Sequence, residues 1–216
     1  MLAITVFLLV ERGDSPCYAA SLRRQIEGNM QTNGWFVEGP EEIAAVKDLD
    51  AMSDRAAAIV IAALVELRVS LAIKSRLQQD QVIIDRMFRA SGPLGSFACK
   101  IDLAFLIEVI TKEAHRDLVV FKNIRNDFAH QLHALDFSAA SIEKECQRLK
   151  LIETQVTDIE DAEADDKAEH HYQTTMQVYD YAAHIANPRG RYVLTGRLFV
   201  AALYPNDFRR MLPPYL

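Results

Sequence analysis

The stretch SDRAAAIVIAALVELRVSLAIKSRL, residues 53–77, decides the fold of this chain. It consists of good helix formers and contains no Gly or Pro, so it predicts one long helix. Ser53 is placed to cap that helix, and Asp54 favours the helix dipole. Its apolar residues are dense enough to cover more than one face, which predicts a central helix with neighbours on several sides.

Amphipathic segments and short breaks alternate along the rest of the chain. The segments that predict further helices are QQDQVIIDRMF (78–88), FACKIDLAFLIEVIT (97–111), a stretch that begins near His115, DFSAASIEKECQRLKL (136–151), KAEHHYQTTMQVYDYAAHIAN (167–187) and RYVLTGRLFVAALY (191–204). Ser96 is placed to cap the second of them, and Ser138 or Ser141 to start the fourth. Pro188 and Gly190 separate the last two.

These segments predict an all-α fold, a helical bundle with a small irregular N-terminal appendage. We expect residues 1–50 to form the appendage, 51–157 the core bundle, 158–166 an acidic linker, and 167–216 C-terminal helices packed on the core. The first ten residues, MLAITVFLLV, are too few to span a membrane and lack a basic region before them. We expect them to form a buried strand or a packed helical turn.

The composition is that of an ordered globular protein, with half of the residues apolar and a quarter charged. The net charge of -6 comes from residues 158–166, which contain six acidic residues and no Lys or Arg. The broad basic face of a nucleic-acid-binding protein is therefore absent. Cys17, Cys99 and Cys146 are far apart and odd in number, which suggests free thiols in a reducing cytoplasm and no structural zinc.

A second stretch, IRNDFAHQL (124–132), places polar residues beside an apolar seam. If this stretch is a helix, four apolar side chains fall within an arc of about 80° and form the core seam: Phe121, Ile124, Phe128 and Leu132. Arg125 lies at the edge of the seam and Asn126 on its flank. His130 lies about 140° round from Arg125 and roughly 7.5 Å further along the axis, so the three side chains could line one groove.

Three segments of this chain resemble a known family. Residues 125–130, RNDFAH, resemble the R-x4-6-H signature of the HEPN superfamily of small helical domains. More specifically, SDRAAAIVIAALVE (53–66), GPLGSFACKIDLAF (92–105) and IRNDFAH (124–130) resemble, in order and spacing, three blocks of the mannitol operon repressor family. The resemblance covers residues 53–135, approximately, and implies an all-helical protein that is linked to transcriptional regulation.

The resemblance also implies how such a protein works. Members of this family lack an evident DNA-binding motif, which implies action through a protein partner. This chain agrees, because it contains no convincing helix-turn-helix and no basic recognition helix. We therefore expect a cytoplasmic bacterial regulator that forms a homodimer, binds a protein partner, and uses neither a cofactor nor a metal. Direct DNA binding and membrane association are not expected, and the regulated operon does not follow from the resemblance.

The wider HEPN superfamily implies an alternative, a metal-independent endoribonuclease or RNA-binding protein, such as a toxin held in check by a partner. In that case His130 would exchange protons with the 2'-hydroxyl or the leaving oxygen. Arg125 would hold the phosphate and offset the charge of the transition state. Asn126 would orient either group by hydrogen bonding.

The same residues also have structural interpretations. Arg125 could pair with Asp54 or Asp102 on a neighbouring helix, and His130 could complete a polar contact between helices. Asp54 and Arg55 start an otherwise apolar helix, which suggests either a buried polar network or an exposed capping turn.

The sequence offers little support for a metal or nucleotide site. Asp127, His130 and His133 are spaced so that they could present three metal ligands along one stripe, but no ligand from a second helix can be identified. Neither GxxxxGK[ST] nor GxGxxG occurs. In SGPLGS (91–96), we expect Gly92 and Gly95 to stand at positive φ or at close contacts between packed helices.

Overall fold

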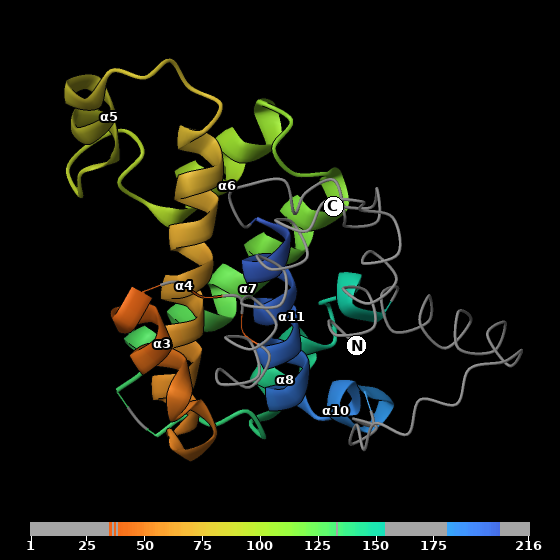
Figure 1. Ribbon diagram of the computed structural model, residues 1–216. Coiled ribbons are helices and arrows are strands. Elements are labelled where there is room, and N and C mark those ends of the chain that lie inside the picture. Colours follow the sequence, from red (N-terminus) through yellow and green to blue (C-terminus); the bar gives the residue numbers. More distant parts are fainter. Residues whose placement is uncertain (1–34, 36, 38, 133, 154–180, 204–216) are drawn as a thin grey trace, which may run out of the picture.

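The computed structural model describes residues 35, 37, 39–132, 134–153 and 181–203, and over these residues every regular element is a helix (Figure 1). The elements are α3 (Gly39–Lys47), the short 3-10 helix η1 (Leu49–Ala51), α4 (Asp54–Lys74), α5 (Gln81–Phe88), α6 (Phe97–Leu106), α7 (Lys112–His130), α8 (Ala140–Cys146), α10 (Tyr181–Ala186) and α11 (Pro188–Ala202). The predicted all-α class is confirmed. The expectations for residues 1–10, for the acidic stretch 158–166 and for residues 167–180 lie outside the described residues.

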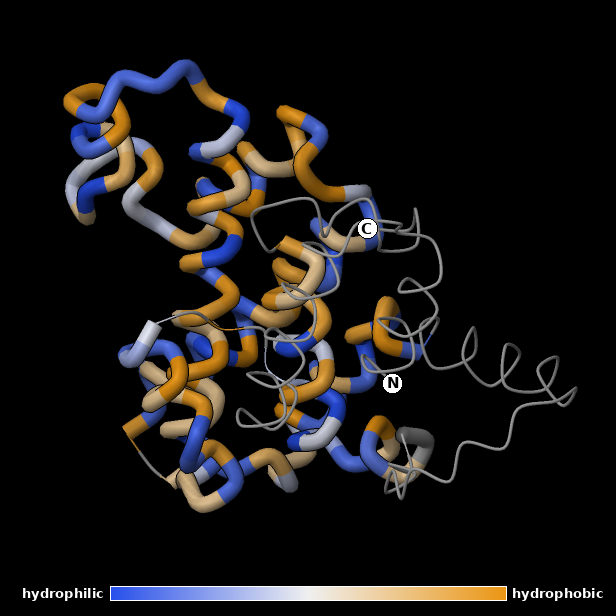
Figure 2. Tube along the Cα trace, viewed as in Figure 1, coloured by the Kyte–Doolittle hydropathy of each residue, from blue (hydrophilic) through white to orange (hydrophobic). Residues whose placement is uncertain are grey.

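Helix α4 is the centre of the bundle, as its composition predicts. It packs against α6, α7 and α11, and α3 lies along it as well (Figure 1). The Ser53 hydroxyl accepts a hydrogen bond from the Ala56 N–H at 3.3 Å, which is the predicted cap. Figure 2 shows that hydrophobic residues recur along the whole of α4. The helix is long and apolar enough to cross a membrane, but 61% of its most apolar window is buried by the other helices, as in the core helix of a bundle.

An aromatic stack joins α7 to α11 beside α4. The rings of Phe121 and Tyr192 are parallel with centroids 4.1 Å apart, and the Tyr192 hydroxyl donates to the Ala58 carbonyl at 3.1 Å. Gly196 lets α11 approach α4 closely, because a Cβ atom at this position would stand 2.3 Å from Cγ2 of Ile61. The packing of α11 on α4 thus depends on a small residue and on one buried tyrosine.

Two helix boundaries differ from the sequence-based prediction. Ser96 caps α6 as expected, but α6 ends at Leu106 instead of continuing to residue 111. Glu108 adopts a positive φ of 57°, and the turn buries Val109 and Ile110. Thr111 then caps α7, which therefore begins three residues before His115. Burial of two apolar side chains in the turn compensates for the helical hydrogen bonds that are lost there.

The predicted position of Leu132 in the core seam is wrong. Helix α7 ends at His130, and Gln131 adopts an extended conformation with φ -76° and ψ 127°. Leu132 consequently leaves the helical arc and is 101% exposed, whereas Phe121, Ile124 and Phe128 are fully buried. Helical periodicity relates these positions only as far as His130, where α7 ends.

The segment SGPLGS forms a tight turn that follows α5. A Cβ atom on Gly92 would stand 2.4 Å from the Arg86 carbonyl oxygen, and one on Gly95 would stand 2.3 Å from that of Ala90. Neither glycine has a positive φ, and the close contacts are with the end of α5 and with the turn itself, not between two core helices as predicted. The turn folds the chain back against the end of α5.

Three other local predictions need correction. Neither Ser138 nor Ser141 caps α8, whose N-cap is Ala139, because the Ser138 hydroxyl donates to Asp136 instead. Residues 39–47 and 49–51 form α3 and η1, although residues 1–50 were expected to be an irregular appendage, and Trp35 before them is buried. Pro188 and Gly190 do not lie between two helices but inside the first turn of α11, which Asn187 caps. A proline at the first helical position needs no N–H there, which makes it compatible with a helix start.

Candidate functional site

Arg125, the first residue of the predicted motif, belongs to a polar cluster where α4, α6 and α7 meet. Its guanidinium lies 3.4 Å from Oε2 of Glu66 on α4 and donates to the Asn126 side-chain oxygen at 3.0 Å. Lys100 on α6 is buried and donates to Oε1 of the same Glu66 at 2.7 Å. Two cations thus share one carboxylate. The predicted pairing of Arg125 with Asp54 or Asp102 is wrong, because the carboxylate within its reach is Glu66.

His130 lies apart from this cluster. It is exposed in the last turn of α7, and no hydrogen bond or ion pair joins it to Arg125 or Asn126. Asp127 is partly buried, and its backbone carbonyl accepts the N–H of Gln131 at 3.2 Å. His133, the third member of the possible metal stripe, lies outside the described residues, within which no group of three metal-ligating side chains occurs.

Asp54 and Arg55 form a network at the N-terminal end of α4. One carboxylate oxygen of Asp54 pairs with Arg189 of α11 at 2.6 Å, and the other accepts the Phe137 N–H at 2.8 Å. Arg55 donates to the Gln131 carbonyl at 2.7 Å. These contacts fasten the chain that follows α7, and also α11, to the start of α4. Of the two interpretations left open by the sequence, a polar network describes the pair better than an exposed capping turn.

Asp102 pairs with a different residue from the one predicted. Its carboxylate lies 2.9 Å from Nε2 of His115 in the next helix, and the His115 ring lies against that of Phe105 with centroids 5.1 Å apart. Asp102 is exposed, so this contact lies at the surface where α6 and α7 approach each other. Surface ion pairs of this kind contribute little to stability.

Besides Lys100, two further buried charged residues were not singled out from the sequence. Asp117 is fully buried in α7 and accepts the N–H groups of Lys150 and Leu151 at 2.6 and 2.8 Å. Arg68, buried in α4, pairs with Glu42 of α3 at 2.6 Å. Phe121 belongs to the core seam, and Asp117 lies four residues before it on the same side of the helix. This spacing could have identified Asp117 as a buried residue.

Two ionisable groups near the contact between α11 and the segment after α8 have shifted pKa values, Glu153 and Cys146. Burial opposes ionisation of Glu153, but hydrogen bonds from Arg191 and Lys150 outweigh it and hold the pKa of Glu153 below its ordinary value. Burial raises the pKa of the Cys146 thiol to about 12. Because a thiolate is the reactive form, Cys146 is an inert core residue.

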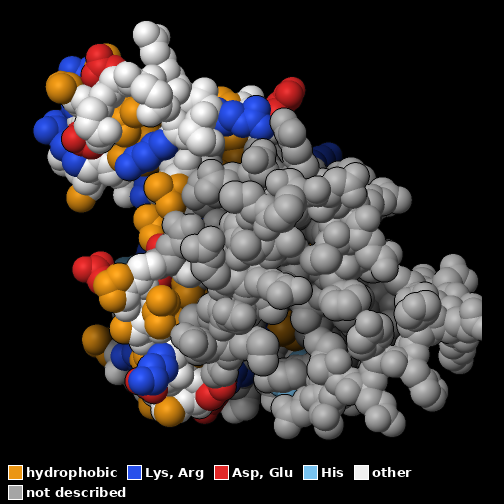
Figure 3. All heavy atoms as spheres, viewed as in Figure 1, with side chains coloured by type: hydrophobic (Ala, Val, Ile, Leu, Met, Phe, Trp, Pro, Cys, Tyr) orange, Lys and Arg blue, Asp and Glu red, His pale blue; other side chains and the backbone are white. Residues whose placement is uncertain are grey.

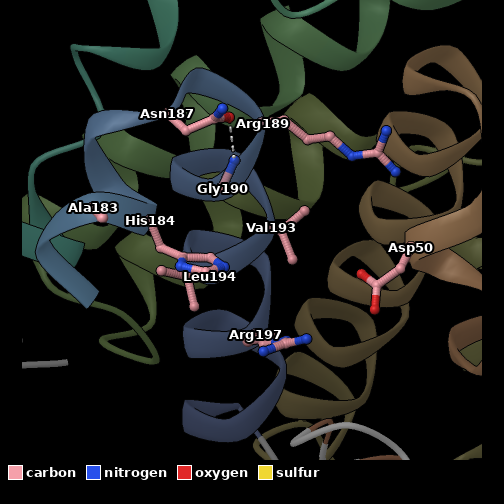
Figure 4. Close-up of a pocket in the computed structure, with 9 residues that line it drawn as sticks. All are labelled: Asp50, Ala183, His184, Asn187, Arg189, Gly190, Val193, Leu194 and Arg197. Atoms are coloured by element: carbon pink, nitrogen blue, oxygen red, sulfur yellow. Dashed lines mark hydrogen bonds between the residues drawn. The ribbon is translucent and has the colours of Figure 1, made fainter. Parts of the chain in front are cut away.

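A groove of about 400 Å³ lies between α10, α11 and η1 (Figure 4). Its lining residues are Asp50, Ala183, His184, Asn187, Arg189, Gly190, Val193, Leu194 and Arg197. Figure 4 shows the Arg197 guanidinium directed from α11 toward the side on which Asp50 lies. Arg189, at the edge of the groove, donates hydrogen bonds to Asp54 and to the carbonyls of Leu49 and Met52. It therefore links α11 to the start of α4 and to η1.

Replacing Glu66 by Ala is expected to lower the free energy of unfolding by about 2 kcal/mol, because Lys100 and Arg125 would then face each other without a carboxylate. Urea unfolding followed by circular dichroism measures this difference. The matched control is Asp102→Ala, which removes an exposed carboxylate and should change the free energy by less than about 0.5 kcal/mol. Equal effects of the two substitutions would contradict a structural role for the Glu66 cluster.

Comparison with known proteins gives the family. The mannitol repressor (MtlR) family model matches residues 44–186, well over half of the chain. A chain of the X-ray structure of the MtlR-HPr complex from Escherichia coli has a similar fold, with a TM-score of 0.52 and 16% sequence identity over 75% of this chain and 97% of that chain. No curated protein sequence matches significantly. The resemblance seen in three sequence segments is therefore confirmed over a longer stretch, and the chain belongs to the mannitol repressor family.

Proposed function

We propose that this chain is a regulatory protein that acts by binding a protein partner, and that the partner is an HPr-like protein. Membership in the mannitol repressor family supports the regulatory role. The structural neighbour from Escherichia coli, which has a similar fold, was crystallised as an MtlR-HPr complex, and this supports the kind of partner. The proposal includes a homodimer in the bacterial cytoplasm.

Family membership is the observation that carries the proposal, and the contacts of Arg125 decide against the ribonuclease alternative. The Arg125 guanidinium is bound to Glu66 and Asn126 at a junction of three helices, and His130 is not joined to it. In a ribonuclease, both groups would have to face one phosphate. The contacts of Arg125 favour a structural role for this residue over a catalytic one. The ribonuclease alternative therefore forms no part of the proposal.

Isothermal titration calorimetry of the purified full chain with HPr from the same organism tests the proposal. We expect saturable binding with a dissociation constant on the order of micromolar, as for transient regulatory complexes. An unrelated protein of similar size and charge serves as the control. If mixing the chain with HPr, each at roughly 100 µM, releases no heat of binding and the two proteins do not co-elute, an HPr-like partner is refuted.

A further inference from the structure

Basic side chains gather at the junction of α4, α6 and α7. Lys100 and Arg125 lie 2.7 and 3.4 Å from the two carboxylate oxygens of Glu66, and their side chains are only 10% and 29% exposed. Lys122 precedes Arg125 by three residues in α7, so the two side chains are neighbours on the surface of that helix. We call Glu66, Lys100, Lys122 and Arg125 the junction cluster.

Lys122 lies on the side of α7 that faces α6. It stands seven residues after His115, which is almost two full turns, so both side chains belong to one row. His115 contacts Asp102 and Phe105 of α6, and these contacts fix the direction of the row. Lys122 is partly buried, and no hydrogen-bond acceptor or carboxylate contacts it within the part of the chain that the structure describes.

The other acidic residues near the junction cluster do not neutralise it. Asp102 is exposed and pairs with His115. Asp127 follows Arg125 by two residues, about 200° round the helix, and therefore lies on another side of α7. Over the described residues, three cations thus share the single carboxylate of Glu66, which leaves two positive charges in excess. Charges that are partly withdrawn from water are costly until a counterion reaches them.

The junction cluster has hydrogen-bond donors to offer to such a counterion. A guanidinium carries five N–H donors, and Arg125 uses one for Asn126 and one for Glu66. Solvent reaches Arg125 Nε and Lys122 Nζ, for which the described residues supply no acceptor. Glu66 and Asn126 meanwhile hold the guanidinium in position, so an anion that binds there needs to order only a few side chains.

The excess of positive charge is local. Figure 3 shows Lys and Arg side chains interspersed with Asp and Glu on the face where α5 lies, and the described residues of that face form no broad basic patch. A nucleic-acid backbone requires a patch of that kind, because it presents many phosphates in a row. A single compact anion with two charges requires only the excess that the junction cluster has.

We propose that the junction cluster binds one phosphate group, either as inorganic phosphate or as a small phosphomonoester. A phosphate of this kind carries a charge of about −1.5 to −2 near pH 7, which matches the excess of the cluster. Arg125 donates to it through the N–H groups that Glu66 and Asn126 leave unused, and Lys122 adds a charged donor from the next turn. His130 is joined to none of these residues, so the site binds the phosphate without cleaving an ester.

Thermal unfolding of the full chain in sodium phosphate tests the inference, with sodium chloride of equal ionic strength as the reference. For a dissociation constant on the order of 1 mM, tenfold more phosphate should raise the melting temperature by about 3–6 °C above the chloride reference. This test is independent of the proposed function, because phosphate binding does not require an HPr-like partner.

Lys122→Ala is the decisive variant. Because the described residues make no polar contact with Lys122, its melting temperature in chloride should stay within about 2 °C of that of the parent, while its dissociation constant for phosphate should rise at least about 10-fold. Lys112→Ala is the matched control, since Lys112 is an exposed lysine at the start of the same helix, and it should keep the full phosphate shift. Equal phosphate shifts in the parent and in Lys122→Ala would reveal a general salt effect and overturn the inference.

Glu66→Gln tests the cluster in the opposite direction. It keeps the shape of the side chain and removes the carboxylate that competes with phosphate, so phosphate should bind at least about 5-fold more tightly. A purely structural Glu66 predicts no such gain, and a folded variant without tighter binding would contradict the site. Glycerol 3-phosphate in the same assay identifies the form of the ligand: tighter binding than inorganic phosphate assigns the site to a phosphomonoester, and weaker binding assigns it to phosphate itself.

Discussion

Replacing Asp117 by Ala is expected to lower the free energy of unfolding by about 3–4 kcal/mol. The carboxylate is fully buried and accepts the backbone N–H groups of Lys150 and Leu151, at the start of the segment that follows α8. Alanine would leave both donors without a partner in a site from which water is excluded, and each such donor costs about 1–3 kcal/mol. For a chain of this size the change corresponds to a drop in melting temperature of about 6–16 °C.

Urea unfolding at the same protein concentration for every variant measures the effect of Asp117→Ala, since stability depends on concentration wherever a protein self-associates. Asp117→Asn is the informative companion, because its amide oxygen can still accept a hydrogen bond, so it should cost less than alanine does. Arg116→Ala is the control, since the Arg116 side chain also contacts Asp117 but is mostly exposed. A variant Asp117→Ala within about 1 kcal/mol of the parent would show that the two N–H groups find other acceptors.

Replacing Tyr192 by Ala is expected to cost about 3–5 kcal/mol, the range for removing a large aromatic ring from a core. The ring is fully buried, stacks on Phe121 and lies 5.4 Å, centroid to centroid, from the ring of Phe137, so its removal opens a cavity between α11 and α7. Such a cavity lowers stability because the surrounding structure relaxes only partly around it.

Tyr192→Phe separates the ring from its hydroxyl. It removes only the hydrogen bond to the Ala58 carbonyl and should cost about 1 kcal/mol. Differential scanning calorimetry of both variants beside the parent measures the difference. If Tyr192→Phe were as damaging as Tyr192→Ala, the hydrogen bond and not the packing would hold α11 on α4.

Local patterns in the sequence predicted the central part of the fold. The density of apolar residues in 53–77 identified α4 as the central helix, and Ser53 and Ser96 cap the helices assigned to them. Both inferences depend on neighbours within one turn, where a side chain and the backbone groups it can reach are fixed by spacing alone. The ends of helices were harder to predict than their centres. Helix α6, for example, stops where the burial of Val109 and Ile110 requires a turn.

The partners of the polar residues could not be predicted in this way. Arg125 pairs with Glu66, which is 59 residues away in the sequence, and Asp54 pairs with Arg189, which is 135 residues away. Which carboxylate a given arginine reaches depends on how α4, α6, α7 and α11 cross, and spacing along one helix does not reveal those crossings.

Helix α11 follows α4 at a long distance in the sequence, which sets an order of events during synthesis. Tyr192 reaches Ala58 across 134 residues, so α4 leaves the ribosome long before the helix that covers part of it. At 5–20 residues per second, approximately, the delay is on the order of 7–27 s. During that interval α4, a helix as apolar as a membrane span, lacks the cover of α11. Only α3, α6 and α7 can pack against it. The core around α4 is therefore completed only when α11 has been synthesised, well after α6 and α7.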